Sequence, residues 1–274
     1  MKKNIAFPGL GLEFQIDRVT FELFGRPIYW YAVIIATGFL LAVFYGMKRS
    51  REFKLSEDNV SGMLLVAFPL AIICARLYYV IFNFKLYKND ILSILYIWEG
   101  GIAIYGAIIG ALIGVFIYCR VKKLPIVGFL DIGALGLLIG QAIGRWGNFV
   151  NAEAFGCETS LPWGMQIGRG ACVHPTFLYE SLWNTIGFVI LHFYSKHRRF
   201  DGEIFWLYVL WYGIGRCFIE GLRTDSLYFF NTGIRTSQAL AGITAVVAVI
   251  VLIYNYNKNN KRKTEVIENE CSDN

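Results

Sequence analysis

Long apolar stretches separated by short polar segments dominate the chain. Seven of them reach the roughly 17–25 residues that a helix needs to cross the hydrocarbon core of a bilayer. They are Ile28–Met47, Val60–Phe82, Gly101–Cys119, Ile126–Trp146, Phe177–Tyr194, Ile204–Leu222 and Ser237–Tyr256. The pattern predicts an all-α, polytopic integral membrane protein with seven transmembrane helices.

A different pattern precedes the first stretch. Apolar and polar residues alternate from Leu12 to Leu23, and this period of two predicts a short strand pair or an extended arm at the membrane interface. We therefore expect an interfacial arm at 1–27, which lacks the basic segment and apolar core of a cleavable signal peptide. A membrane domain follows at 28–256 with a loop at 147–176, and the polar tail at 257–274 is expected to be disordered.

The distribution of charge predicts the orientation. Of the 274 residues, 56% are hydrophobic and 17% are charged, against about 25% charged in soluble domains. More than half of the 26 lysines and arginines follow the first, third, fifth and seventh stretches: Lys48, Arg49, Arg51, Lys54, Arg120, Lys122, Lys123, Lys196, Arg198, Arg199, Lys258, Lys261, Arg262 and Lys263. The positive-inside rule makes that side cytoplasmic, so the N-terminus, the arm and the loop lie outside and the tail lies inside. We expect a multi-pass protein of the cell (cytoplasmic) membrane.

Two of the apolar stretches carry glycine ladders with a four-residue repeat. The ladders are Gly106, Gly110 and Gly114 in the third stretch, and Gly136, Gly140 and Gly144 in the fourth. Such ladders let helix backbones approach closely. We expect them to pack helices rather than to carry chemistry, so that a leucine at Gly140 would force helices apart.

The densest polar chemistry beside apolar sequence lies at 140–156, where an arginine, two asparagines and a glutamate are punctuated by glycines. Those glycines allow the backbone to approach whatever Arg145 and Asn148 hold. The alternative is a helix end capped by asparagine and glycine.

Several polar side chains share one depth in the outer leaflet once the topology is drawn: Tyr31, Arg76, Tyr105, Arg145, Arg216, Glu220 and Arg223. The last three lie on one helix face because they are spaced i, i+4 and i+7. A charge at the bilayer centre costs about 2.5–3.5 kcal/mol, so convergence at one depth predicts a pocket. The alternative is a set of Arg–Glu pairs that lock helices together.

An arginine presents a planar fork that matches phosphate or carboxylate oxygens. The expected pocket opens into the outer leaflet and is walled by tryptophans: Trp98, Trp146, Trp206 and Trp211. An anionic phospholipid headgroup fits these two features better than a soluble anion does.

Other chemistries find no support in the sequence. Nucleotide-binding, GxSxG and HExxH patterns are absent, and the six cysteines show no metal-ligand spacing. We expect no metal, no organic cofactor and no nucleic-acid partner. Cys157 and Cys172 share the loop and could pair if it faces an oxidising compartment.

The segment from Gly144 to Gly156 reads G-R-W-G-N-F-V-N-A-E-A-F-G. It resembles GRxGNFxNxExxG, the signature of the prolipoprotein diacylglyceryl transferase family. Further matches to this family, which extend the resemblance over essentially the whole chain, are Tyr31, Trp98–Gly101, His174–Glu180 and Gly215–Arg216 with Glu220 and Arg223.

The resemblance implies transfer of the diacylglyceryl group of phosphatidylglycerol to the lipobox cysteine thiol of a prolipoprotein. A thioether forms and glycerol phosphate leaves. In the implied reaction, Arg145 and Arg216 clamp the phosphate, and Glu220 holds an arginine. Asn148, Asn151 and Glu153 orient the glycerol and the loop. Tyr31 lies near the headgroup, and Gly156 and Arg223 contribute to substrate binding.

The base is left open by a departure from the family, whose third span commonly carries a histidine where this chain has Tyr105. Three possibilities follow: Tyr105, the outer-side His174, or the phosphate itself accepts the thiol proton.

Two other function classes also remain. A transporter would show repeats and a midplane site, whereas the inner half offers only Asp131 as a clear intramembrane charge. A non-catalytic lipid-binding protein would form no product.

Overall fold

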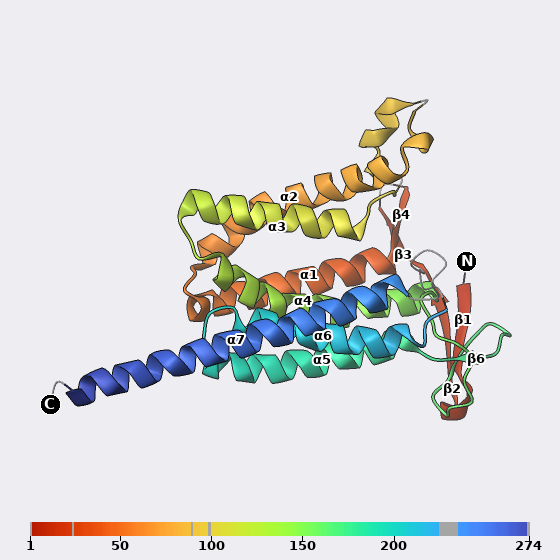
Figure 1. Cartoon of the computed structure of the whole chain (residues 1–274). Coiled ribbons are helices and arrows are strands. Elements are labelled where there is room, and N and C mark those ends of the chain that lie inside the picture. Colours follow the sequence, from red (N-terminus) through yellow and green to blue (C-terminus); the bar gives the residue numbers. More distant parts are fainter. Residues whose placement is uncertain (1, 24, 89, 98–99, 225–234, 273–274) are drawn as a thin grey trace. The chain divides into compact units, whose positions relative to one another are not determined.

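The computed structural model describes residues 2–23, 25–88, 90–97, 100–224 and 235–272. Trp98 and Glu99, which contribute to the family resemblance, lie outside these residues. Most of the chain is helical (Figure 1): α1 (Trp30–Arg49), α2 (Glu57–Phe82), α3 (Ile104–Lys122), α4 (Ile126–Asn151), α5 (Thr176–Tyr194), α6 (Glu203–Glu220) and α7 (Thr236–Ser272). Short 3₁₀ helices occur at Pro8–Leu10, Ser50–Phe53, Phe84–Leu86, Ile91–Leu95 and Ser195–His197.

A helix covers most of each predicted stretch, and among the described residues five helices are long and apolar enough to cross a membrane. The five are Trp30–Phe53, Glu57–Phe82, Ile104–Lys122, Ile126–Asn151 and Thr236–Lys261. The shorter α5 and α6 carry glutamates, an arginine and many aromatic residues, which lower their apolar character. The chain is therefore an integral membrane protein of mostly helical structure.

The chain forms two compact units. The first comprises Met1–Tyr45 and Asp131–Asn274, and the second comprises Gly46–Leu130. Helices α1 and α4 each contribute residues to both units.

A small antiparallel sheet belongs to the first unit. Its strands are β1 (Lys2–Phe7), β2 (Leu12–Asp17), β5 (Met165–Ile167) and β6 (Cys172–Val173), in the order β2-β1-β5-β6. A separate hairpin pairs β3 (Val19–Leu23) with β4 (Arg26–Tyr29). The strands predicted at Leu12–Leu23 are confirmed, although they pair with β1 and β4 rather than with each other.

The sheet packs on the ends of α4 and α5. Ile5 and Phe7 of β1 form a buried cluster with Met165 of β5, Ala152 after α4 and Phe177 of α5. In Figure 1, β1 and β2 run across the ends of α4 and α5 rather than along them. The N-terminal arm and the loop after α4 therefore form one structure, which holds the end of the segment at 140–156.

The glycine ladder of α3 packs tightly within the second unit, as predicted. Cβ atoms built on the glycines would overlap α2: Gly106 meets the Cys74 carbonyl, Gly110 the Leu70 carbonyl and Gly114 the backbone of Ala67. These glycines allow the backbones of α2 and α3 to approach closely.

The packing prediction for Gly140 of the α4 ladder was wrong. A Cβ on Gly140 would meet nothing within 4 Å. Close packing here comes instead from Gly38 of α1, whose Cβ would lie 3.5 Å from the Gly140 carbonyl oxygen. A side chain at Gly140 would therefore extend into open space. The part of Gly140 that faces α1 is its backbone carbonyl.

Two buried carboxylates order the end of the first unit where α6 begins. Asp131 accepts hydrogen bonds from the backbone N–H groups of Gly202 at 2.7 Å and Phe205 at 2.9 Å, and so caps α6. Glu203 accepts from Tyr194 at 2.5 Å and Tyr256 at 2.6 Å. Asp131 is therefore a helix cap, and the expectation that it is the only clear charge in the inner half overlooked the fully buried Glu203.

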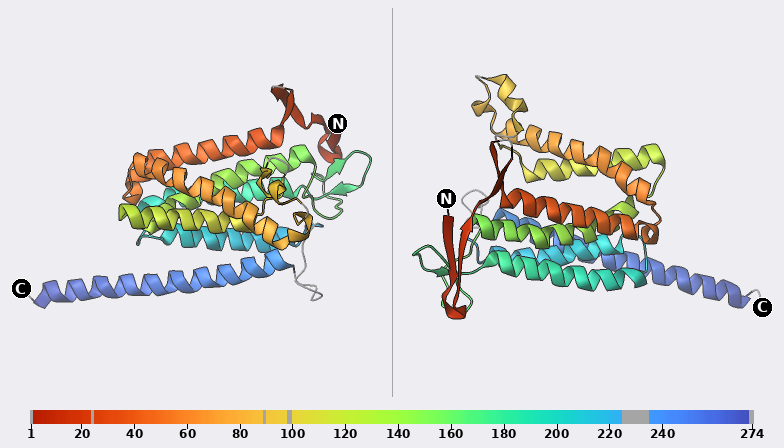
Figure 2. Two further views of the ribbon diagram at one scale, coloured as in Figure 1. Left: turned by 90° about the horizontal axis from the view of Figure 1, so that it is seen from above. Right: turned by 180° about the vertical axis from the view of Figure 1, so that it is seen from behind.

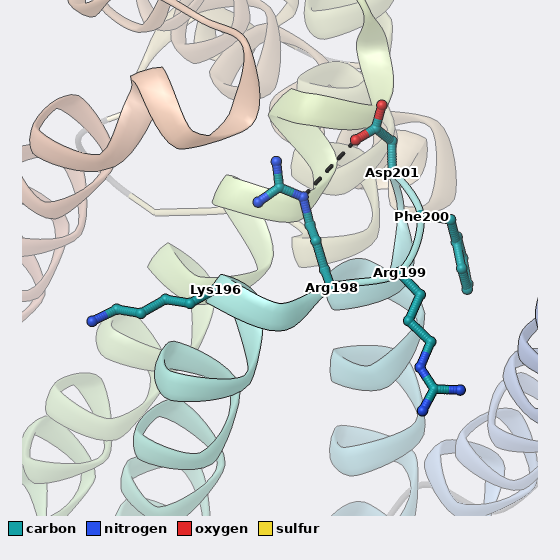
Figure 3. Close-up of a pocket in the computed structure, with 5 residues that line it drawn as sticks. All are labelled: Lys196, Arg198, Arg199, Phe200 and Asp201. Carbon is teal, nitrogen blue, oxygen red and sulfur yellow. Dashed lines mark ion pairs between the residues drawn. The ribbon is translucent and has the colours of Figure 1, made fainter.

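A shallow basic pocket lies at the turn between α5 and α6. Figure 3 shows Arg198 directed at Asp201, with a distance of 3.9 Å between the charged atoms, while Lys196 and Arg199 point away from each other. The pocket follows the far end of α5 from Glu180, roughly 24 Å along the helix axis at the standard rise. The pocket is thus separate from the polar residues around Glu180.

Helix α7 corrects the prediction of a disordered tail. It continues without a break to Ser272, and its C-terminal part extends beyond the ends of α5 and α6 (Figure 2). The segment after Tyr256 contains no glycine or proline to end a helix, and its lysines and glutamates favour helix.

Candidate active site

Three arginines converge on one buried carboxylate in the first unit. Glu180, near the start of α5, is 6% exposed. Its Oε2 lies 2.5 Å from Arg145 Nη2 of α4. Its Oε1 lies 3.5 Å from Nη1 of Arg216 of α6 and 3.5 Å from Nη1 of Arg223 beyond α6. We call these four residues the Glu180 cluster.

A second glutamate holds the α6 arginine. Arg216 Nη2 lies 2.6 Å from Glu220 Oε2, one helical turn along α6, and Glu220 is 1% exposed. The ion pair that the resemblance implied for Glu220 is therefore present. The Glu220 carbonyl accepts a hydrogen bond from Arg235 Nη1, which sequence reasoning had not singled out.

The two helices carrying these groups are locked by a reciprocal tryptophan contact. Trp183 of α5 and Trp211 of α6 stack with ring centroids 4.4 Å apart, and each indole N–H donates to the other's backbone carbonyl at 3.0 Å. Gly215 lies under the Trp183 ring and Gly187 under the Trp211 ring, where a Cβ would overlap the indole. The contact fixes the register of α5 and α6, and hence of Glu180 against Arg216.

Helix α4 is tied to α5 beside the cluster. Trp146 donates from its indole N–H to Ser181 Oγ at 3.2 Å, and Ser181 donates to the Ala142 carbonyl at 2.8 Å. Because these residues adjoin Arg145 and Glu180 in sequence, the two bonds hold that ion pair in place. Trp146 and Trp211 thus connect helices, and their expected place in the wall of a pocket stays a prediction.

An amide network continues from Arg145 along the end of α4. Arg145 Nη1 donates to Asn148 Oδ1 at 3.3 Å, and Asn148 Nδ2 donates to Glu153 Oε1 at 3.0 Å. Asn151 Nδ2 donates to the same oxygen at 3.2 Å. Left-handed conformations at Ala152 (φ 47°) and Ala154 (φ 54°) turn the chain back, which brings Glu153 against the last turn of α4.

The N-terminal arm caps this same helix end. Lys3 Nζ and Arg18 Nη2 donate to the Asn151 carbonyl at 3.0 Å and 2.6 Å. Cations at a helix C-terminus are favourable because the carbonyls there lack intrahelical partners. Burial, and then the neighbouring Arg18, lower the pKa of Lys3.

Gly156 acts through its backbone. Its N–H donates to the His174 carbonyl at 2.9 Å, and it forms an antiparallel bridge with Arg223. A Cβ on Gly156 would lie 2.7 Å from His174 Cβ, so a larger residue would push apart the chain segments that carry Gly156 and His174. Gly156 therefore places Arg223; its contribution to substrate binding stays a prediction.

The two candidate bases have different surroundings. Nδ1 of His174 lies 3.2 Å from the Tyr179 hydroxyl, which also accepts from the Trp163 indole at 2.8 Å. Tyr105 belongs to the second unit, where it is exposed and its ring lies 6.3 Å from that of Tyr78.

Tyr31 lies beside α4, the signature helix, and its expected place near the headgroup stays a prediction. A Cβ on Gly147 would lie 2.7 Å from Cδ2 of the Tyr31 ring, so the glycine makes room for the tyrosine. The predicted residues that the structure joins through contacts are Arg145, Asn148, Asn151, Glu153, Gly156, Arg216, Glu220 and Arg223.

Arg76 does not belong to an anion pocket. In the second unit, its guanidinium donates to backbone carbonyls: Ser93 at 2.7 Å, Ile94 at 2.7 Å, Gly100 at 2.6 Å and Gly101 at 2.8 Å. The charge thus organises the turn before α3.

Among the other expectations, Cys157 and Cys172 are free thiols in this structure.

Glu180 is the main residue of the site that sequence reasoning missed. In the sequence, Glu180 stands out only as the end of the His174–Glu180 match. A single acidic residue in an apolar stretch, in a chain with several intramembrane arginines, was the available signal.

The arginines retain 21% (Arg145), 15% (Arg216) and 12% (Arg223) side-chain exposure, so a ligand can still reach them. Their forks suit the oxygens of a phosphate.

Comparison with known proteins agrees with this chemistry. The family model of prolipoprotein diacylglyceryl transferase matches residues 18–254. A phosphatidylglycerol–prolipoprotein diacylglyceryl transferase of Clostridioides difficile is 40% identical over 245 residues, 89% of this chain and 98% of that protein. Proteins with the same description are 41% identical in Pediococcus pentosaceus, over 92% of this chain and 95% of the relative, and 44% identical in Finegoldia magna, over 89% and 97%. The chain belongs to the prolipoprotein diacylglyceryl transferase family.

Proposed function

We propose that this chain transfers the diacylglyceryl group of phosphatidylglycerol to the lipobox cysteine of a prolipoprotein. The observation that carries the proposal is the Glu180 cluster, in which three arginines converge beside the Asn148–Glu153 network. The relatives that share most of the chain's length are described as enzymes of this type.

The reaction exchanges one bond for another. The cysteine sulfur attacks the glyceryl carbon that carries the phosphate oxygen, a carbon–sulfur bond forms, and the carbon–oxygen bond breaks. Its electron pair leaves with the phosphate oxygen of glycerol phosphate, and the thiol proton passes to a base. Arg145 and Arg216 would stabilise the charge that develops on the leaving group, an effect that grows where water is excluded.

The neighbouring groups have supporting roles in this proposal. Asn148, Asn151 and Glu153 orient the glycerol of the headgroup, and Arg223 adds a third donor to the phosphate. Tyr31 lies beside the signature helix and contacts the headgroup region. Tyr105, His174 and the phosphate itself remain the candidates for accepting the thiol proton.

The proposed setting is the cell membrane, with seven spans, an outer N-terminus and a site that faces the outer leaflet. The four basic clusters support this orientation. The arm and the loop then lie outside, where exported prolipoproteins arrive, and the partners are phosphatidylglycerol and lipobox-containing preproteins.

The test is a transfer assay in phosphatidylglycerol micelles with a lipobox peptide. Arg145→Lys and Arg216→Lys keep the charge but lose the fork, and we expect each to lose at least about tenfold in transfer rate. Arg198→Lys is the matched control, because Arg198 pairs with Asp201 at the other end of α5, and it should retain the rate. Near wild-type transfer by either cluster variant would remove that arginine from the clamp.

A transporter of an anionic solute is the alternative. The capping role of Asp131 weakens it, since that carboxylate is already bonded to two N–H groups. Formation of a thioether product would separate the enzyme from both a transporter and a non-catalytic lipid-binding protein.

A further inference from the structure

Glu180 is surrounded by positive charge on three sides. One oxygen faces Arg145, and the other faces Arg216 and Arg223. An anionic ligand of the same arginines would therefore either compete with this carboxylate or bind next to it. It is buried, whereas the arginines stay partly exposed, so a ligand must approach from the arginine side.

The proposed reaction changes the charge of its phosphorus compound. Phosphatidylglycerol is a phosphodiester with one negative charge, whereas the released glycerol phosphate is a monoester with a second pKa near about 6. At neutral pH the product therefore carries close to two charges. A site made of arginines alone would hold this product more tightly than the substrate, and turnover would slow.

We propose that Glu180 is a positioning residue that also selects by charge: it gathers the three arginines around one phosphate and weakens their hold on the doubly charged product. This inference rests on the proposed function. Its negative charge leaves enough positive potential for a phosphodiester but opposes a second charge on the leaving group. Glu180 thereby promotes product release.

Other charged groups near the cluster do not alter this comparison. Glu220 is paired with Arg216, Arg235 donates to the Glu220 carbonyl, and Glu153 accepts from Asn148 and Asn151. Since they are the same in wild type and in a Glu180 variant, a change in anion preference reports on Glu180.

The experiment measures inhibition of transfer by added sn-glycerol 1-phosphate, with neutral glycerol as the control inhibitor. Glu180→Gln keeps the size and removes the charge. We expect its inhibition constant for glycerol phosphate to fall roughly tenfold, about the worth of one weak charge-assisted contact. The maximal transfer rate should fall, while the apparent KM for phosphatidylglycerol changes less than about threefold.

Two further measurements distinguish charge from structure. The tightening should be larger at about pH 8 than at about pH 5, where the product is mostly a monoanion. Glu203→Gln removes another buried carboxylate from the same unit and should leave the inhibition constant unchanged. Glu180→Asp keeps the charge and should keep the inhibition constant within about threefold, even if the shorter side chain slows transfer.

The inference is overturned if Glu180→Gln transfers lipid and its inhibition constant for glycerol phosphate is unchanged or larger than that of wild type. It is also overturned if Glu203→Gln lowers this inhibition constant as Glu180→Gln does. Should Glu180→Gln fail to fold in detergent, tighter product binding by Glu180→Asp would overturn it instead. Absence of transfer by the folded wild type would refute the proposed function and not only the role of Glu180.

Discussion

At the scale of single residues, charge in an apolar stretch was readable from sequence but its partner was not. Arg145 and Arg216 stood out because a membrane charge is costly and arginine suits phosphate. Glu180 was missed because its three partners lie on α4, on α6 and beyond α6. Arg76 was read in the same way as Arg145, yet backbone carbonyls surround it. Sequence shows the cost of a charge, and tertiary structure decides what satisfies it.

Asn148 offers a residue-scale prediction. Its amide donates to Glu153 Oε1 while its oxygen accepts from Arg145. Asn148→Asp keeps the shape but replaces the donor with a second negative charge, and we expect a loss of about 1–3 kcal/mol in stability with most of the transfer activity. Thermal unfolding in detergent and the transfer assay measure both. Wild-type activity would show that the Asn148–Glu153 bond is dispensable.

At the scale of elements, apolar length predicted the positions of the helices well, whereas their contacts needed the structure. Helix α4 runs on to Asn151 and α7 to Ser272, because polar residues that leave the membrane can continue a helix. The Trp183–Trp211 contact was not foreseen, although a tryptophan precedes a glycine by four residues in both α5 and α6. The Gly140 ladder was overinterpreted, since a four-residue repeat does not say which glycine faces a neighbour.

Gly215 and Gly140 form a matched pair for testing helix packing. A methyl group at Gly215 would overlap the Trp183 indole, and at Gly140 it would meet nothing within 4 Å. We expect Gly215→Ala to destabilise the protein by about 1–3 kcal/mol and to reduce transfer by shifting Glu180 against Arg216. Gly140→Ala should be neutral or slightly stabilising, because alanine favours helix. Equal effects in thermal unfolding would contradict this assignment of the packing.

At the scale of the whole molecule, hydropathy predicted a mostly helical membrane protein, and the small sheet was only half predicted. The alternation at Leu12–Leu23 indicated strands, but β5 and β6 are too short to show a recognisable alternation in the sequence. They exist because the loop after α4 pairs with the arm through β1 and β5. Such pairing between distant segments leaves no local pattern.

Orientation is a prediction at this same scale. A reporter fused after Lys123 or Arg199 should be cytoplasmic, and one inserted near Ser160 should be outside, because the positive-inside rule predicts that the basic clusters lie on the inner side. Enzyme reporters active on only one side of the membrane provide the measurement. The reverse pattern would place the Glu180 cluster in the wrong leaflet for the proposed reaction.

The central claim is that the purified chain converts phosphatidylglycerol and a lipobox thiol into a thioether and glycerol phosphate. The most direct measurement incubates the protein with phosphatidylglycerol and a lipobox peptide and quantifies both products by mass spectrometry. Equal amounts of diacylglyceryl-peptide and glycerol phosphate are predicted from wild type, with both products strongly reduced together in Arg145→Lys. Folded wild-type protein that yields neither product, or glycerol phosphate without lipopeptide, would contradict the claim.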